Sequence, residues 1–233
     1  MTPDSSNPAA PQAALLVLGI DTCGPSGSVA LGRLIGDGVE VLSQIELEGR
    51  TYSATLVAAV SEILTRHKVA LRDVGCLVVV NGPGSFTGVR VGLSAAKGLS
   101  EGADIPVIAV SRLEVLASKA GIADTALDAH RHEVFLRAGG RELLAGVSDL
   151  ATLGPAAEIA VCDPAAGALI ATAWPATNVR TVAAPTASDA LLLAAPLIHA
   201  RQFADVALLD GHYLRRSDAE IFGDPAVVPV KRA

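Results

Sequence analysis

Apolar positions along the first third of the chain follow a two-residue period and then change to a helical one. Residues 14–21, 28–35 and 39–47 are apolar or alternating runs separated by glycine-rich turns, which predicts three antiparallel strands. Over residues 51–68 the apolar side chains recur every three or four positions, as in a helix that packs on one face. The chain therefore opens as a three-stranded meander followed by a helix.

Strands and helices alternate after this opening. Residues 76–80 are wholly apolar, as in a strand buried on both faces of a parallel sheet, and a helix over 86–100 and a strand over 105–110 follow. Three antiparallel strands followed by strand–helix units indicate an α/β layer with a mixed sheet.

A second unit with the same order begins near Ser111. We predict for it a helix at 112–120, a strand at 121–127, a hairpin of 130–138 and 141–147, strands at 158–162 and 178–182, and a helix at 186–202 capped by Thr186 or Ser188. We therefore expect two α/β domains, at residues 13–110 and 111–220, between a disordered lead-in at 1–12 and a tail at 221–233.

Composition and charge narrow the classes of function. The net charge is −6 and the sequence shows no basic stripe, so we expect any role in nucleic-acid chemistry to run through a partner. The apolar runs are too short or too interrupted for a membrane span, and the first residues do not resemble a secretory signal. Cys23, Cys76 and Cys162 lack a CxxC spacing, so we expect apolar fillers in a cytoplasmic protein.

The most unusual stretch is NGPGSFTGVRVGLSAAKGLS at residues 81–100, between a predicted strand and a predicted helix. Backbone N–H groups at a helix N-terminus can hold an anion, but the spacing fits neither a P-loop nor a dinucleotide fingerprint. The alternative is a tight turn at Gly82, Pro83 and Gly84, with Ser85 as the helix cap.

The helix in this stretch carries a stripe of small residues, because Gly88, Gly92 and Ala96 lie four positions apart. Each glycine in an exposed helix costs about 1 kcal/mol of helix propensity, so a close packing contact should offset it. The contact is either with the sheet of the same domain or with a helix of another chain.

Two further groups could carry chemistry. Asp21 and Thr22 end the first strand, where a carboxylate can orient a metal or a phosphate or can form an Asx-type turn with backbone N–H groups. Asp128, His130 and His132 alternate along one predicted strand, so they would share a face that is either a metal site or solvated edge polarity. His67, His199 and His212 are isolated and predict surface or helix-end positions.

Several segments together resemble the TsaB (YeaZ) family. They are LGIDTCGPSGSVAL at 18–31 and VVVNGPGSFTGVRVGLSAAKGL at 78–99, with weaker support from LDAHRHEVF at 127–135 and HYLRR at 212–216. The resemblance implies an actin-like ATPase fold of the acetate/sugar kinase–Hsp70–actin type, with two related domains that each have a mixed sheet and flanking helices. It also leaves Asp21 and Thr22 as a residual nucleotide cleft.

The resemblance further implies a scaffold subunit without catalytic residues, metal or cofactor. The family pairs with the catalytic subunit TsaD and the ATPase TsaE to transfer threonylcarbamoyl to the adenosine next to the anticodon of ANN-decoding tRNAs. The tRNA is then met only through the complex. Catalytic relatives carry a metal-binding HxxxH on the first long helix, whereas the matching helix here reads RTYSATL.

In the family this pairing uses the two helices of the first domain, and a homodimer can form through them when the partner is absent. We accordingly predict an interface of Tyr52, Thr55, Leu56, Ala59, Phe86, Gly88, Val89, Gly92, Leu93 and Ala96. The chain departs from the family pattern at Tyr52, His130 and His132. The alternatives are an ATP-dependent small-molecule kinase or transferase of the same fold and, less favoured, a metal-dependent peptidase.

Overall fold

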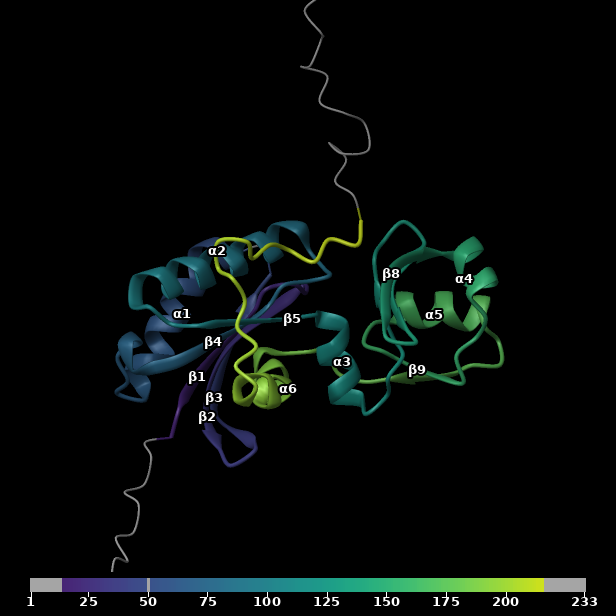
Figure 1. Cartoon of the computed structure of the whole chain (residues 1–233). Coiled ribbons are helices and arrows are strands. Elements are labelled where there is room, and N and C mark those ends of the chain that lie inside the picture. The colour runs from purple at the N-terminus through teal and green to yellow at the C-terminus, as the bar shows by residue number, and fades with distance from the viewer. Residues whose placement is uncertain (1–13, 50, 216–233) are drawn as a thin grey trace, which may run out of the picture.

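Two five-stranded sheets with the same strand order organise the molecule (Figure 1). The computed structural model describes residues 14–49 and 51–215, so the predicted lead-in and tail lie outside the described residues. The first sheet has the order β3-β2-β1-β4-β5, and the second has the order β8-β7-β6-β9-β10. In each sheet three consecutive strands pair antiparallel, and two more strands are added in parallel.

The first sheet contains the longer strands, with two apolar strands at its centre. Its members are β1 (Leu16–Asp21), β2 (Ser26–Ile35), β3 (Gly38–Glu48), β4 (Val74–Val80) and β5 (Val107–Val110). Nearly every residue of β1 and β4 is buried, because helices cover both faces of the sheet. The predicted strands of this half are confirmed, with small shifts at their ends.

Helices lie on both faces of the first sheet (Figure 1). Helices α1 (Tyr52–Arg66) and α2 (Phe86–Ala103) lie side by side on one face, and α6 (Ala187–His199) packs on the other. Glycines let α6 approach closely: a Cβ on Gly19 would lie 2.9 Å from the Ala187 carbonyl oxygen, and a Cβ on Gly32 would lie 3.1 Å from Leu191 Cδ1. A short 3₁₀ turn, Leu71–Asp73, precedes β4.

The second sheet is smaller and carries two helices that the sequence pattern did not predict. Its strands are β6 (Thr125–Asp128), β7 (Glu133–Ala138), β8 (Arg141–Gly146), β9 (Glu158–Val161) and β10 (Asn178–Thr181). The additional helices are α4 (Val147–Leu153) and α5 (Pro164–Ala173). They pack with Trp174, whose indole N–H donates to the Leu150 carbonyl over 2.8 Å.

The two domains exchange one helix each. Helix α3 (Arg112–Ala120) follows the first sheet but packs against β6, β7 and β9, whereas α6 follows the second sheet but packs on the first. The predicted boundary at residues 110 and 111 therefore assigns α3 to the domain on which it packs but assigns α6 to the other one. Thr186, not Ser188, caps α6, and its hydroxyl accepts from the Asp189 N–H.

The segment His130–Arg131–His132 is a turn, so the predicted strand over these residues is wrong. All three residues have positive φ, of 59°, 56° and 62°, between β6 and β7. His130 Nδ1 bonds the Asp128 carboxylate over 2.9 Å, and that carboxylate also accepts from the His130 backbone N–H. The alternation that would place Asp128, His130 and His132 on one strand face therefore does not exist.

Candidate functional site

The loop that leads from β4 into α2 packs against the turn between β1 and β2. Ser85 is the N-cap of α2 and accepts from the Gly88 N–H over 3.3 Å, while its own N–H donates to the Cys23 carbonyl over 2.8 Å. A Cβ on Gly84 would lie 2.3 Å from that same carbonyl oxygen, so only glycine fits there. The segment from Gly82 to Ser85 is thus the predicted turn and cap.

The stripe of small residues on α2 faces the protein's own sheet. A Cβ on Gly88 would lie 2.0 Å from the Thr22 carbonyl oxygen, and a Cβ on Gly92 would lie 2.4 Å from Thr22 Oγ1. Ala96 is fully buried on the same side. The prediction that this stripe meets a helix of another chain is therefore wrong, because Thr22, directly after β1, fills the space that the missing side chains leave.

Most of the other residues predicted for the interface also point inward. Buried positions among them are Tyr52, Leu56, Ala59, Val89 and Leu93. Thr55 is half-buried, and Phe86 is 39% exposed. Any contact between α1, α2 and a partner must therefore use the side of these helices that faces away from the sheet.

The middle of that opposite side carries no charged residue, whereas Glu62, Arg90 and Glu101 are exposed around it. We call this uncharged middle part the α1/α2 outer face and define it by nine exposed or half-buried residues, which are Ala54, Val57, Ala58, Ser61, Thr87, Val91, Ser94, Ala95 and Gly98. Val57 is 63% exposed, and residues 52–61 contain no charged side chain. Sequence reasoning overlooked this face, although the uncharged run in α1 was visible.

An aromatic stack borders this face at the first turn of α2. The rings of Phe86 and Tyr213 lie 4.9 Å apart, and the Arg90 guanidinium lies 3.8 Å from the centre of the Phe86 ring. Arg90 is the only charged residue among residues 85–96. The end of the described chain therefore contacts the start of α2.

The side chains considered for a nucleotide cleft are buried. The Asp21 carboxylate accepts from the Cys23 N–H over 2.8 Å, which confirms the Asx-type alternative, and the Thr22 hydroxyl donates to the Gly88 carbonyl over 2.7 Å. Burial raises the pKa of the Asp21 carboxyl, and the positive charge of Arg112 opposes that rise. In this packing neither Asp21 nor Thr22 presents its side chain to a ligand.

Two more buried side chains, Tyr52 and Arg112, pack beside the turn between β1 and β2. The Tyr52 hydroxyl donates to the Gly24 carbonyl over 2.8 Å, and burial raises the pKa of Tyr52 to about 12. Arg112 is buried, and its Nε lacks a hydrogen-bond partner among the described residues. A Cβ on Gly24 would lie 2.5 Å from an Arg112 terminal nitrogen, so the guanidinium occupies the space beside the β1–β2 turn.

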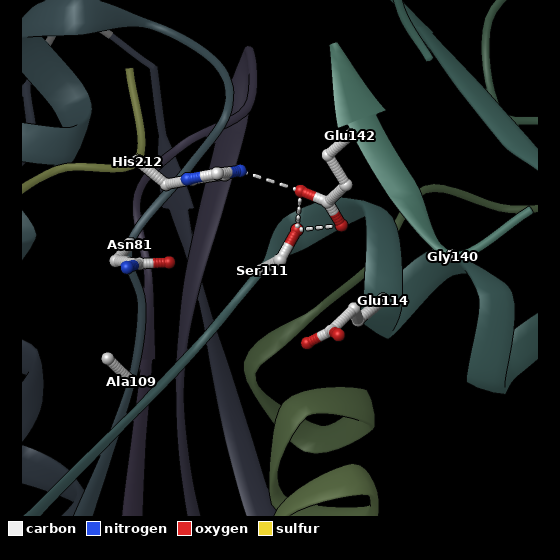
Figure 2. A pocket seen from close by; sticks show the side chains of 7 residues that line it. All are labelled: Asn81, Ala109, Ser111, Glu114, Gly140, Glu142 and His212. Carbon is white, nitrogen blue, oxygen red and sulfur yellow. Dashed lines mark hydrogen bonds and ion pairs between the residues drawn. The ribbon is translucent and has the colours of Figure 1, made fainter. Parts of the chain in front are cut away.

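A polar pocket of about 340 Å³ lies where the two domains meet (Figure 2). Its lining residues are Asn81, Ala109, Ser111, Glu114, Gly140, Glu142 and His212. The Glu142 carboxylate of β8 accepts from the Ser111 hydroxyl over 2.7 Å and lies 2.8 Å from His212 Nε2. The pocket thus centres on a hydrogen-bonded carboxylate that connects three separate segments.

Neither a metal-binding cluster nor a membrane-spanning helix occurs among the residues that the structure describes. Histidine, cysteine and carboxylate side chains do not gather there in any group of three or more that could hold a metal ion. None of the helices in this part of the chain combines the length and apolar character needed to cross a membrane.

Several known proteins resemble the chain in sequence. Residues 40–172, more than half of the chain, match the family model described as TsaD, tRNA N6-adenosine threonylcarbamoyltransferase. The tRNA threonylcarbamoyladenosine biosynthesis protein TsaB of Escherichia coli is 41% identical over 104 residues, which are 45% of this chain and 43% of that protein. The chain spans about half the length of the TsaB relatives that it matches.

Three further matches cover most of the chain. An uncharacterized protein of Mycobacterium tuberculosis is 31% identical over 208 residues, which are 88% of this chain and 93% of that protein. The solved structure of YeaZ from Pseudomonas aeruginosa is 27% identical, with a TM-score of 0.64, and covers 87% of this chain and 100% of its own. A second Pseudomonas aeruginosa structure, described as similar to peptidase YeaZ, is 26% identical with a TM-score of 0.68, covering 88% and 100%.

Proposed function

The chain belongs to the TsaB (YeaZ) family, and from that premise we propose that it acts as a non-catalytic subunit in the synthesis of threonylcarbamoyladenosine in tRNA. Its two domains have the actin-like ATPase fold, as the resemblance of its motifs predicted. In this proposal the subunit binds the catalytic subunit TsaD, the ATPase TsaE joins the pair, and tRNA is contacted only through the complex.

The observation that carries the proposal is the α1/α2 outer face. Solvent-facing helix surfaces usually carry charged and polar side chains, whereas the middle of this one exposes Val57 with alanine, serine and glycine around it and leaves the charged Glu62 and Arg90 at its border. Small side chains let the backbone of a partner helix approach closely, and uncharged ones avoid the cost of burying charge at the centre of an interface. The face therefore has the properties of a helix-to-helix contact.

The buried contacts of Tyr52, Asp21 and Thr22 support the non-catalytic part of the proposal. Tyr52 is the first residue of α1, and its hydroxyl donates a hydrogen bond to the Gly24 carbonyl. The helix also lacks the HxxxH of the catalytic relatives. Asp21 and Thr22 are engaged with backbone groups. Calorimetric titration of the isolated chain with ATP and Mg²⁺ tests the alternative: tight binding with turnover would favour a kinase or transferase.

The same face also supports self-association when the partner is absent. A two-fold axis that passes just outside the α1/α2 outer face would place the small residues of one copy against those of the other, because a two-fold interface uses the same patch twice. TsaD would then compete with a second copy of this chain for one surface, so heterodimer and homodimer exclude each other.

Ala58→Arg tests the proposed interface directly. Ala58 is exposed at the middle of α1, so arginine should leave the fold intact but place a charge at the centre of the contact. Ala171→Arg is the matched control, because Ala171 is an exposed alanine on α5 of the second domain. Calorimetry with TsaD should show a loss of about 2 kcal/mol or more for Ala58→Arg alone. Equal affinity of a folded Ala58→Arg protein and the control would overturn the proposal.

A further inference from the structure

The last five residues that the structure describes, 211–215, cross from the first domain to the second, and we call them the strap. The His212 N–H donates to the Asn81 carbonyl over 2.7 Å, at the end of β4, and the Tyr213 ring contacts Phe86 at the start of α2. Arg215 then donates to the Ala129 carbonyl over 2.8 Å and pairs with Glu133 of β7. The strap thus joins α2 and β4 to the second sheet.

One side chain of the strap meets a carboxylate of the other domain inside the pocket. Glu142 of β8 is only 11% exposed, and its Oε2 lies 2.8 Å from His212 Nε2 (Figure 2). The Ser111 hydroxyl donates to the same carboxylate from the link between β5 and α3. Glu142 of the second domain therefore bonds both the strap and the link that leaves the first domain after β5.

We infer that His212 and Glu142 form a proton-dependent clasp between the two domains. With His212 protonated, the ion pair holds β8 against the strap. With His212 neutral, only a weaker hydrogen bond remains, and the two domains separate more readily at this edge.

The charges around His212 agree with this direction. The hydrogen bond to Glu142 raises the pKa of His212, partial burial opposes the rise, and the negative charges of Glu142 and Glu114 add to it. Arg137 of β7 faces Glu142 from the other side, with its Nε 3.8 Å from Oε1. Asn81 and Ser111, which complete the surroundings, are neutral.

The sign of the pH effect follows from the raised pKa. A histidine free of its partner titrates at about 6.5, so the ion pair contributes fully below that pH. Its contribution is lost as the pH rises through the higher pKa that His212 has in the folded protein. The clasp is therefore closed in mildly acidic solution and loosens in mildly alkaline solution.

The clasp is also connected to the α1/α2 outer face, through Tyr213 of the strap. Tyr213 follows His212 directly and stacks on Phe86, the first residue of α2. Displacement of the strap would thus remove a contact from the first turn of that helix. This consequence rests on the proposed function, whereas the clasp itself is a property of the isolated chain.

The first test measures the ion pair in the isolated full chain. The five histidines are titrated by NMR, and the loss of one signal in His212→Gln identifies His212. The pKa of His212 should be raised in the wild type and should fall in Glu142→Gln. His199→Gln is the matched control, because His199 bonds the Gly36 carbonyl and should leave the His212 titration unchanged. An unchanged pKa of His212 in Glu142→Gln overturns the pair.

The second test measures whether the pair holds the domains together. Hydrogen exchange of the strap and of the turn between β7 and β8 is followed from about pH 5.5 to about pH 8.5, on both sides of the ordinary histidine pKa, with correction for intrinsic exchange. Protection should fall severalfold with rising pH in the wild type and in His199→Gln, but not in His212→Gln. The same pH dependence in His212→Gln and the wild type overturns the clasp, whereas TsaD binding unaffected by Ala58→Arg overturns only the proposed function.

Discussion

The two domains share one strand order but differ in the size of the apolar core that each one buries. Strands β2 and β3 have 10 and 11 residues, whereas the corresponding β7 and β8 have 6 each. The connection after the meander is the 15-residue α1 in the first domain and the 7-residue α4 in the second. The longer sheet supports a pair of full helices, whose outer side is then available to a partner. The same topology therefore yields the proposed binding surface in one domain and a small core in the other.

The exchange of α3 and α6 adds a second difference. Helix α6 completes the large core of the first domain, while α3 contributes Leu113 and Leu116 to a small cluster with Leu127 and Phe135 of the second. Lys119 of α3 bonds Asp189 of α6 over 2.7 Å, so the exchanged helices also contact each other. The second domain thus depends on neighbours more than the first does, because its own cluster around Trp174 is small.

Leu150→Ala should have the largest effect, and it acts on the smaller core. Leu150 is fully buried beside Trp174, so its truncation should cost about 3 to 4 kcal/mol, the range for a buried leucine whose site cannot collapse. Trp174 is the only tryptophan of the chain, so its fluorescence reports on the second domain, while far-UV circular dichroism reports on both. In urea, the fluorescence transition should move to lower concentration than the dichroism transition.

Leu18→Ala is the counterpart in the first domain, since Leu18 is fully buried in β1. It should lower the dichroism transition and leave the fluorescence transition nearly in place. Coincident fluorescence and dichroism transitions in both variants would mean that the two domains unfold as one unit. The difference in core size would then not give the domains different stabilities.

Gly92→Leu should have the next largest effect, on the first domain. A side chain there meets Thr22 Oγ1 at once, so overpacking should cost about 2 to 3 kcal/mol. Gly98→Leu is the matched control on the same helix, because nothing lies within 4 Å of its Cβ position, and it should be neutral or slightly stabilising. Equal stability of the two variants, measured by urea unfolding, would contradict the packing of the stripe against β1.

Gly98→Leu also separates stability from binding. Gly98 belongs to the α1/α2 outer face, so leucine there should weaken TsaD binding in calorimetry without lowering the urea midpoint. Gly92→Leu should lower the urea midpoint, but the folded fraction should bind TsaD as the wild type does, since the new side chain points away from the proposed partner. This pair of outcomes would tell the inner side of α2 from the outer one.

Sequence patterns predicted the regular parts of the fold well. The period change at residue 51 and the apolar run at 76–80 correctly placed α1 and β4, because one-sided and two-sided burial leave different signatures. Helices α4 and α5 were not predicted: α4 has only 7 residues, and the sequence of α5, PAAGALIATA, is apolar apart from Thr172 and shows no helical period. Short or uniformly apolar helices leave little periodicity to detect.

The candidate site was predicted less well, for two physical reasons. The stripe of Gly88, Gly92 and Ala96 correctly indicated a close contact, but a stripe does not show which neighbour fills it. The alternation of Asp128, His130 and His132 resembled a strand, although three residues with positive φ turn the chain there. Contacts such as His212 with Glu142 join positions 70 residues apart, and periodicity carries no information about them.

Thr186→Ala should have the smallest effect, and it tests the helix exchange. The Thr186 hydroxyl caps α6 and also bonds the Asp189 carboxylate over 2.8 Å, so its removal should cost about 1 kcal/mol. Thr172→Ala is the matched control, because the Thr172 hydroxyl is exposed on α5 and bonds the Ala168 carbonyl within its own helix. Since α6 follows the second sheet in sequence but packs on the first, the loss should appear in the dichroism transition and spare the Trp174 fluorescence. A fluorescence midpoint that falls as far as the dichroism midpoint would show that α6 stabilises the domain it follows in sequence as much as the one on which it packs.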